Sequence, residues 1–397
     1  MADKIPILFL HAQDGFGADA AVHADIIRQL DREKFEVHVA CTGGDGRREP
    51  PSLEIWRSLP EIKLRPTRFA PSLGSKNVAA LVRAVRSGAA FSGDFLALRK
   101  YVAQEGIRIV HSTERPRDAS YNIALSKATG ARSVVHVHVK WSKQYSLPAR
   151  FGVARADAVF SISRYVTSTL LAMGRPASSI HTILNGIDPS KWDPAIDGNE
   201  LRRELGVPAD VLVLASVSRL FSWKGQRELI RAFALVHAVI ENVRLLIVGA
   251  DASEVEGGSF SDELKELASN LGVRQKVIFT GARSDVPRVM AACDVFSMPS
   301  FEEPFGLVFL EAMAMKRPVV AIDNGGTPEV VEAGETGLLS PPWDIAALAA
   351  NLLTLLRDPA LRARMGERGR ARLLEHFTSQ RMARDAEKGY EAVLARD

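Results

Sequence analysis

The stretch Ser300-Phe-Glu-Glu-Pro-Phe-Gly-Leu-Val-Phe-Leu-Glu-Ala-Met-Ala314 carries the strongest signal in the sequence, because it combines a helix start with charged side chains. Pro304 suits the first position of a helix, where its missing N–H costs nothing. The first-turn N–H groups would then have no partner within the helix, and they belong to Phe305, Gly306 and Leu307. Unpaired amides at the positive end of a helix dipole form a site for an anion.

Two carboxylates flank this predicted anion site. Glu303 would lie just ahead of the anion, and Glu311, about two turns into the helix, would reach a second part of the same ligand. A ligand that carries both phosphate and hydroxyl groups fits this layout, and a sugar nucleotide is such a ligand. On its own, the pair of carboxylates fits a glycosidase or a structural helix cap equally well.

Strand-like apolar runs alternate with helical patterns along the whole chain, which predicts an α/β protein with parallel sheets. The predicted strands cover residues 5–10, 35–40, 107–110, 133–137, 158–162, 211–217, 243–248, 276–279, 295–298 and 318–321. The turn signal Asn185-Gly186 divides them into two doubly wound halves. Because ligands of open α/β sheets bind beyond the carboxyl ends of the strands, we expect the functional residues in the loops that follow strands.

Two cations follow the first predicted strand of the second half, in Ser216-Val-Ser-Arg-Leu-Phe-Ser-Trp-Lys-Gly225. Arg219 suits bidentate contacts to oxygen and Lys224 is a compact point charge, so the pair could neutralise a diphosphate. The chain has no Asp-x-Asp motif, and we therefore predict that these cations take the electrostatic role of a metal ion. The alternative is a pair of solvated surface charges.

Glycines stand in several loops that follow predicted strands. Gly15 and Gly17 follow the first strand, where glycine would let the backbone approach a phosphate closely before a helix from about Ala20. A plain strand-to-helix turn is the alternative, since the third glycine of a dinucleotide fingerprint is missing. Gly249 follows another strand on the same presumed edge.

His136 and His138 share one face of a predicted strand, because side chains alternate along a strand. The sequence shows no third ligand beside them, so we predict no metal site. His138, at the strand end, is the better candidate for a polar contact with a ligand, and a satisfied core histidine is the alternative. Cys41 and Cys293 lie far apart, which argues against a disulfide framework and fits a reducing cytoplasm.

The charge is divided unevenly between the two halves. Residues 1–187 hold 26 Lys and Arg against 16 Asp and Glu, a net +10, whereas residues 188–397 hold 25 against 31, a net −6. Much of the excess positive charge lies between Arg57 and Lys100. This charge could attract an anionic membrane or a phosphorylated acceptor. The alternative is that it only forms a solvated surface. No apolar run has the length of a spanning helix or a signal-peptide core. We expect a cytoplasmic protein without a nucleic-acid partner, and we hypothesise peripheral contact between its N-terminal half and the inner face of the membrane.

The order of the motifs resembles that in the retaining glycosyltransferases of family four, which have the GT-B fold. The resemblance covers nearly the whole chain and is strongest from Ala156 to Pro342. Two positions depart from the family pattern: Gly15-Phe-Gly17 replaces adjacent glycines, and Lys316 stands where a glycine is common. The matching motifs are Asn185-Gly-Ile-Asp188, Arg219 with Lys224-Gly225, Glu303 to Glu311, and Gly325-Gly-Thr-Pro-Glu329.

This resemblance implies two facing Rossmann-like domains, with the nucleotide sugar held mainly by the C-terminal domain and the acceptor mainly by the N-terminal one. Glu311 would bond the ribose, and Glu303 would lie near the donor sugar. Arg219 and Lys224 would hold the diphosphate, and His138 would lie beside the sugar. The remaining nucleotide-sugar contacts would come from Gly15, Gly17, Gly249, Ala282, Arg283, Phe305, Gly306 and Leu307.

We therefore expect residues 1–186 to bind the acceptor, residues 187–375 to bind the nucleotide sugar, and residues 376–397 to form a helix that crosses back to the first domain. The predicted activity is a metal-independent, retaining transfer from a nucleoside-diphosphate sugar to a hydroxyl acceptor, such as a lipid-linked or cell-envelope glycan precursor. No cofactor is expected, and the departing phosphate would take the acceptor's proton. The rival functions are a glycosidase, a sugar-nucleotide epimerase and a binding protein without turnover.

Overall fold

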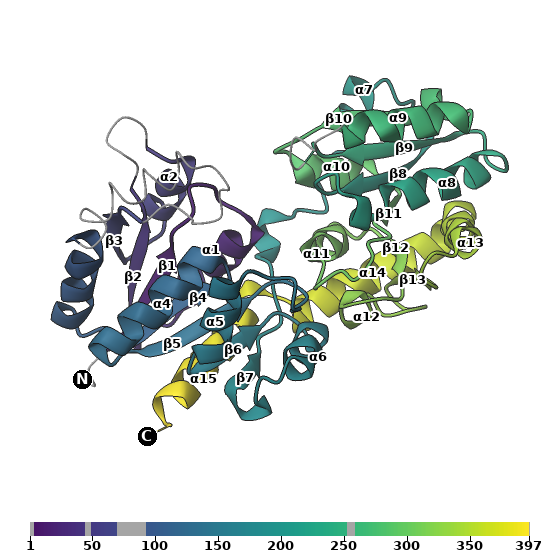
Figure 1. Ribbon diagram of the computed structural model, residues 1–397. Coiled ribbons are helices and arrows are strands. Elements are labelled where there is room, and N and C mark those ends of the chain that lie inside the picture. Colours follow the sequence, from purple (N-terminus) through teal and green to yellow (C-terminus); the bar gives the residue numbers. More distant parts are fainter. Residues whose placement is uncertain (1–3, 44–48, 70–92, 252–258, 397) are drawn as a thin grey trace. The chain divides into compact units, whose positions relative to one another are not determined.

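The computed structural model describes residues 4–43, 49–69, 93–251 and 259–396, and it divides into two compact units (Figure 1). The first unit comprises Met1–Asn185 and Ser379–Asp397, and the second comprises Gly186–Thr378. Of the basic stretch between Arg57 and Lys100, residues 70–92 lie outside the described ranges. Within those ranges, no helix combines the length and the apolar character that a membrane crossing needs.

The first unit is built on a seven-stranded sheet whose neighbouring strands all run parallel, in the order β3-β2-β1-β4-β5-β6-β7. Its strands are β1 (Ile5–His11), β2 (Phe35–Thr42), β3 (Ile62–Thr67), β4 (Ile109–Thr113), β5 (Arg132–Val137), β6 (Ala158–Ser161) and β7 (Ile180–Thr182). Its α-helices include α1 (Ala18–Gln29), α2 (Pro51–Arg57), α4 (Pro116–Thr129), α5 (Leu147–Arg155), α6 (Arg164–Ala172) and α15 (Ser379–Leu394).

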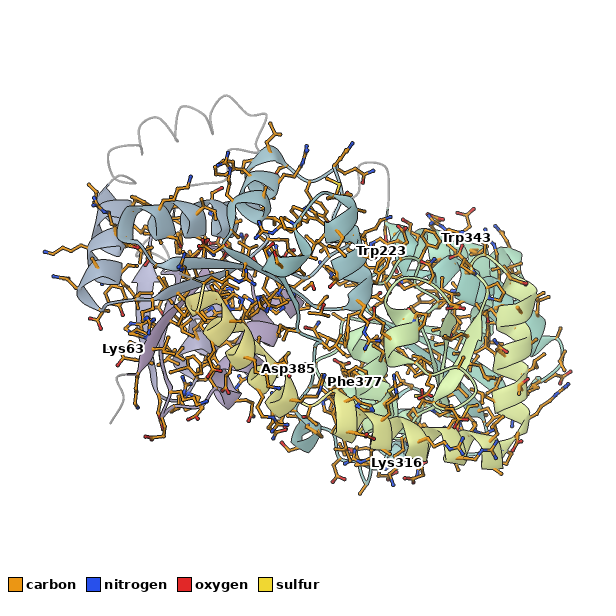
Figure 2. The ribbon with its side chains drawn as sticks, turned by 90° about the horizontal axis from the view of Figure 1, so that it is seen from below. Lys63, Trp223, Lys316, Trp343, Phe377 and Asp385 are labelled. Carbon is orange, nitrogen blue, oxygen red and sulfur yellow. The ribbon has the colours of Figure 1, made fainter. Side chains whose placement is uncertain are left out.

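The chain's last helix, α15, belongs to this first unit although it follows the whole second unit in sequence. It packs against α1, and its Asp385 is labelled in Figure 2. Tyr390 on α15 is fully buried, and its hydroxyl lies 2.6 Å from Nδ1 of His111 on β4. The C-terminal helix therefore contributes to the core of the first unit.

The second unit is built on a six-stranded parallel sheet in the order β10-β9-β8-β11-β12-β13. Its strands are β8 (Leu212–Val217), β9 (Val243–Val248), β10 (Val277–Gly281), β11 (Val295–Ser297), β12 (Val319–Ile322) and β13 (Gly337–Ser340). Its α-helices include α7 (Asn199–Glu204), α8 (Gln226–His237), α9 (Phe260–Asn270), α10 (Val286–Ala292), α11 (Leu307–Ala314), α12 (Thr327–Val330), α13 (Ile345–Arg357) and α14 (Pro359–His376).

Strands of the second sheet are buried on both faces, which explains their continuous apolar sequences. On β8, Leu214 packs into one hydrophobic core while its neighbours Val213 and Ala215 pack into another. On β9, Leu245 packs into the same core as Leu214, and its neighbour Leu246 packs into the other core. Alternation of side chains along a strand sends neighbours to opposite faces, and both faces here are covered by helices.

Both sheets reverse their strand order at one point, between β1 and β4 in the first unit and between β8 and β11 in the second. Such a reversal opens a crevice at the carboxyl ends of the strands, and this is where open α/β sheets bind ligands. The predicted loops after β1, β8 and β11 all leave the sheets at these two points. The fold therefore places the candidate residues where ligand binding is expected.

The ten predicted strands are all confirmed, but the sequence reading missed β3, β7 and β13. All three are edge strands, which have a partner on one side only. Strand β3 carries Lys63, Arg65 and Pro66, and β7 is three residues long and partly exposed. An edge strand needs neither a long nor a strictly apolar sequence, so its pattern is weak.

Candidate active site

The helix at the centre of the opening stretch begins three residues later than predicted. Helix α11 starts at Leu307, and Pro304 lies before it rather than at its first position. Gly306 caps the helix with φ 91°, a left-handed conformation that favours glycine. A Cβ there would stand 2.4 Å from Cδ2 of Phe309, so the site tolerates glycine alone. The sharp turn at Gly306, which the sequence pattern did not reveal, delays the helix.

The three predicted amides still lie at the start of this helix. Among the residues that the structure describes, none accepts a hydrogen bond from the backbone N–H of Phe305, Gly306 or Leu307. Two of them precede the helix and the third is its first residue. Unpaired N–H groups beside the positive end of the helix favour an anionic ligand.

Glu303 and Lys224 form a buried ion pair, with Lys224 Nζ 2.7 Å from Glu303 Oε2. Their side chains are 8% and 14% exposed, respectively. Ser300 Oγ donates to the same carboxylate oxygen at 2.8 Å, whereas no described residue donates a hydrogen bond to the other oxygen, Oε1. The ammonium also lies 4.0 Å from the centre of the Trp223 ring. The structure thus joins two side chains that the sequence assigned to separate parts of the ligand.

Glu311 is the fifth residue of α11, about one turn into the helix rather than two. Its side chain has no hydrogen-bond or ion-pair partner among the described residues. Burial raises the pKa of this carboxyl group from its usual value of 4.5 to about 7. A carboxyl group in such surroundings, without a protein partner, is suited to bind hydroxyl groups of a ligand.

Arg219 follows β8 and is exposed. Its guanidinium lies 5.2 Å from the centre of the Phe221 ring and makes no ion pair with a described residue. Gly249 packs directly behind this loop, where a Cβ would come 1.8 Å from the carbonyl oxygen of Ser218. Gly249 is therefore required by close packing, and its predicted ligand contact is not needed to explain it.

The pair Ala282 and Arg283 follows β10. The Arg283 guanidinium is bound by Asp285, with Nε 2.8 Å from Oδ1, and by Glu204, with Nη1 2.8 Å from Oε1. Hydrogen bonds to these carboxylates raise the pKa of Arg283. Its side chain thus holds the loop in place, which leaves the backbone as the part available to a ligand.

Trp223 and Trp343 line a pocket of the second unit, and both are labelled in Figure 2. Trp343 is 63% exposed and has φ 66°, which is unusual for a bulky residue.

Lys316 is one of the two departures from the family pattern. It has φ 55°, a left-handed conformation that explains why a glycine suits its position.

In the first unit, the loop after β1 lines a pocket of about 250 Å³ together with Asp19 and Arg115. At Gly17, a Cβ would lie 2.6 Å from Oδ1 of Asp19 and 3.3 Å from Nη2 of Arg115, so this glycine makes room for an ion pair. At Gly15, by contrast, a Cβ would have no atom of a described residue within 4 Å, and those residues give no packing reason for the glycine. Its predicted phosphate contact stays a prediction.

His138 lies just after β5, and its backbone N–H donates to Glu114 Oε2 at 3.2 Å. Burial lowers the pKa of His138 to about 4, so the imidazole is neutral near pH 7. Its Nε2 atom is buried and has no hydrogen-bond partner among the residues that the structure describes. Burial, reinforced by the charge of Asp19, raises the pKa of Glu114 to about 7.

Sequence reasoning missed the charged residues that accompany His138 in this unit. Asp19 pairs with Arg115, and Asp118 accepts a hydrogen bond from the backbone N–H of Ala12 at 2.9 Å. Burial raises the pKa of Asp19, but the hydrogen bond and charge of Arg115 outweigh this effect and lower it to about 2. The charged run Thr113-Glu-Arg-Pro116, which begins soon after the predicted strand 107–110, was the available signal.

Two further histidines lie beside the predicted pair. His23 on α1 and His111 on β4 are fully buried next to His136, and the three rings could together hold a metal ion. The sequence showed no third ligand, because these residues are more than 20 positions apart and only the packing of α1 against the sheet brings them together. His11 extends the group, with Nε2 3.0 Å from Nδ1 of His23.

Family models match both halves of the chain. The model described as Glycosyltransferase Family 4 matches residues 20–191, and the model described as Glycosyl transferases group 1 matches residues 197–372.

Curated proteins similar to this chain are glycosyltransferases. A GDP-mannose-dependent alpha-(1-6)-phosphatidylinositol monomannoside mannosyltransferase of Mycolicibacterium smegmatis is 34% identical over 66% of this chain and 74% of that protein. The N-acetyl-alpha-D-glucosaminyl L-malate synthase of Bacillus anthracis is 32% identical over 62% of this chain and 63% of its own length. The D-inositol 3-phosphate glycosyltransferase of Corynebacterium glutamicum is 38% identical, and this chain spans only 46% of its length.

Solved structures match over nearly the whole chain. HepE of Anabaena in complex with UDP and glucose has a TM-score of 0.80 at 25% identity, covering 97% of this chain and 99% of that one. Sucrose-phosphate synthase of Thermosynechococcus elongatus has a TM-score of 0.79 at 23% identity, covering 99% of this chain and 100% of that one, which is a likeness of fold.

Proposed function

The chain belongs to glycosyltransferase family 4 and has the GT-B fold, and on that premise we propose that it transfers a sugar from a nucleoside-diphosphate sugar to a hydroxyl acceptor with retention of configuration. One observation carries the proposal. At the switch point of the second sheet, the unpaired amides of residues 305–307 lie in the same short segment as Glu303, which holds the ammonium of Lys224. A sugar diphosphate would accept hydrogen bonds from the amides and the ammonium, and it would offer sugar hydroxyl groups to the carboxylate.

The diphosphate would be bound by Arg219, Lys224 and the helix amides. An ammonium has three N–H donors, and Glu303 occupies one of those of Lys224, which leaves the others for phosphate oxygens. Negative charge grows on the leaving phosphate in the transition state, and donors that are already positioned stabilise it without further reorganisation. Lys224, held at 2.7 Å by a buried carboxylate, is such a donor.

Glu303 would position the sugar rather than attack it. Its Oε2 atom is occupied by Lys224 and Ser300, and its Oε1 atom is left to accept a hydrogen bond from a sugar hydroxyl. A carboxylate whose charge is neutralised by a neighbouring ammonium is a weak nucleophile. In the proposed reaction the bond from the sugar to the leaving phosphate breaks, the acceptor oxygen bonds to the same face of the sugar, and the phosphate takes the acceptor's proton.

The acceptor would be bound by the first unit, where the pocket of about 250 Å³ is lined by His11, Gly15, Gly17 and Arg115. A pocket of this size suits a polar, hydroxyl-bearing group, and Arg115 suits an anionic substituent on it. The names of the relatives include inositol phosphate, phosphatidylinositol and malate, which supports an anionic acceptor. A lipid-linked acceptor and contact with an anionic membrane extend this proposal, and binding to anionic vesicles that weakens with added salt would support them.

The donor is identified by screening the full-length protein against a panel of nucleoside-diphosphate sugars and measuring protection from thermal unfolding. We expect protection by one or a few donors, followed by their consumption only when a hydroxyl acceptor is added. Conversion of the donor without an acceptor indicates an epimerase, and cleavage of a simple glycoside without nucleotide indicates a glycosidase. Protection without any consumption, over a broad acceptor panel, indicates a binding protein. Each of these three results refutes the proposal.

A further inference from the structure

Three fully buried histidines converge in the first unit from separate elements. His23 comes from α1, His111 from β4 and His136 from β5. Each offers a ring nitrogen, and the three nitrogen atoms lie within 4.8 Å of one another. Buried imidazoles normally have hydrogen-bond partners, so a group of three in one place needs a physical explanation.

The spacing of the rings is close to that of ligands around one metal ion. Tetrahedral zinc with Zn–N bonds of about 2.0–2.1 Å places its ligand nitrogens roughly 3.3 Å apart. Nε2 of His23 is already 3.2 Å from Nδ1 of His136. The ring centre of His111 lies 4.5 Å from that of His23 and 5.5 Å from that of His136. The three nitrogens, within 4.8 Å of one another, are therefore near the spacing of ligands around one ion.

Some ring nitrogens in this group have nothing to bind. Nε2 of His111 and Nε2 of His136 are buried without a hydrogen-bond partner among the described residues. A buried polar atom left without a partner destabilises the folded protein. A metal ion bound by Nε2 of His111 would give this atom a partner.

Two ring nitrogens of this group contact a neighbouring side chain, as the non-ligating ring nitrogen of a metal-bound histidine does. Nδ1 of His111 lies 2.6 Å from the hydroxyl of Tyr390, and Nδ1 of His23 lies 3.0 Å from Nε2 of His11. Such second contacts fix the tautomer and the orientation of a ligand ring. If Nδ1 of His111 donates to the tyrosine oxygen, its Nε2 atom carries the lone pair that a metal requires.

We propose that His23, His111 and His136 bind one divalent transition-metal ion, of the class of Zn²⁺, Co²⁺ and Ni²⁺. An all-imidazole set without carboxylate favours these ions over Mg²⁺ and Ca²⁺, which prefer oxygen ligands. His138, whose ring centre lies 4.2 Å from that of His136 and whose Nε2 is buried without a partner among the described residues, is a candidate for the fourth position, and water is the other. The ion ties α1 to the centre of the sheet, and its role is structural, separate from the diphosphate site of the second unit.

The test uses full-length protein that has been stripped with a chelator and then titrated with Co²⁺. We expect one equivalent to bind with the visible absorption of tetrahedral Co²⁺, and the melting temperature to rise with metal concentration. His136→Gln is expected to weaken binding at least about 100-fold, and Tyr390→Phe, which removes only an outer hydroxyl, about 10-fold. His181→Gln is the matched control in the same unit, and it should bind Co²⁺ as the unaltered protein does.

Absence of stoichiometric binding overturns the proposal, and so does equal affinity in the unaltered protein and in His136→Gln. Should His136→Gln fail to fold, the unaltered protein decides the matter by X-ray absorption of its zinc-loaded form. Three or four nitrogen ligands at about 2.0 Å support the site. Fewer than three nitrogen ligands, or sulfur ligands from the buried Cys41, overturn it.

Discussion

Replacement of Lys224 by methionine tests whether this side chain serves catalysis or only neutralises Glu303. The two side chains are 14% and 8% exposed and lie 2.7 Å apart, so the substitution leaves a buried carboxylate with Ser300 as its one remaining described partner. Removing one member of a buried ion pair costs about 3 kcal/mol of unfolding free energy. Losing one positioned, charge-stabilising group lowers turnover roughly 10²- to 10³-fold. Both effects are expected in Lys224→Met.

The double variant Lys224→Met with Glu303→Gln separates these effects. A neutral amide at position 303 no longer needs the ammonium, and it can still accept the hydrogen bond from Ser300. We expect the double variant to recover most of the lost stability, to within about 1 kcal/mol of the unaltered protein, because replacing both members of a buried pair is close to neutral. Its turnover should stay at or below that of Lys224→Met.

Urea unfolding measures the stability of each variant, and release of nucleoside diphosphate in the presence of acceptor measures its turnover. Lys265→Met is the matched control, since Lys265 pairs with Asp262 on the exposed face of α9. That change should alter stability by less than about 1 kcal/mol and leave turnover unaffected. Recovery of turnover together with stability in the double variant would refute the catalytic role of Lys224.

Three further predictions concern the same unit. Gly306 has φ 91°, and a Cβ there would lie 2.4 Å from Phe309, so Gly306→Ala should lower the unfolding free energy by about 3 kcal/mol. Gly272 has φ 71°, and a Cβ there would have no atom of a described residue within 4 Å, so Gly272→Ala should lower it by only about 1 kcal/mol. Equal urea midpoints of the two variants would contradict this prediction. The folded-state pKa of Glu311 is raised, so its ionisation destabilises the protein as pH rises from about 4.5 through 7. Glu311→Gln should therefore gain about 2 kcal/mol relative to the unaltered protein between pH 5 and pH 8, and a gain that is independent of pH would be inconsistent with the raised pKa. Arg219→Ala should lower kcat/KM about 10- to 100-fold with an unchanged melting temperature, and unchanged kinetics with the identified donor would remove Arg219 from the site.

The fold followed from the sequence wherever strands are buried on both faces. Val243 to Val248 and Val211 to Val217 are largely apolar, because helices cover both sides of the central strands. Three of the four edge strands, β3, β7 and β13, could not be recognised in this way, and β3, for example, includes Lys63 and Pro66. Their formation depends on a neighbouring strand, which a local pattern does not reveal.

The sequence placed several candidate residues in loops that follow strands, but it did not reveal the contacts between them. The sequence placed Lys224 and Glu303 in loops that follow neighbouring strands, yet the ion pair between them depends on how those loops fold. The start of α11 was predicted too early, because Pro304 is a favourable first residue of a helix. The left-handed turn at Gly306 could not be recognised from the sequence pattern. His23 and His111 were missed because each stands alone in its own segment.

The anomeric outcome of the reaction tests the central claim most directly. Once the donor and an acceptor are identified, proton NMR can follow the first glycoside that the enzyme forms. We predict that this glycoside carries the anomeric configuration of the sugar in the donor, and that an equimolar amount of nucleoside diphosphate is released. Products of the opposite configuration would contradict a retaining transfer at the site formed by Arg219, Lys224 and Glu303.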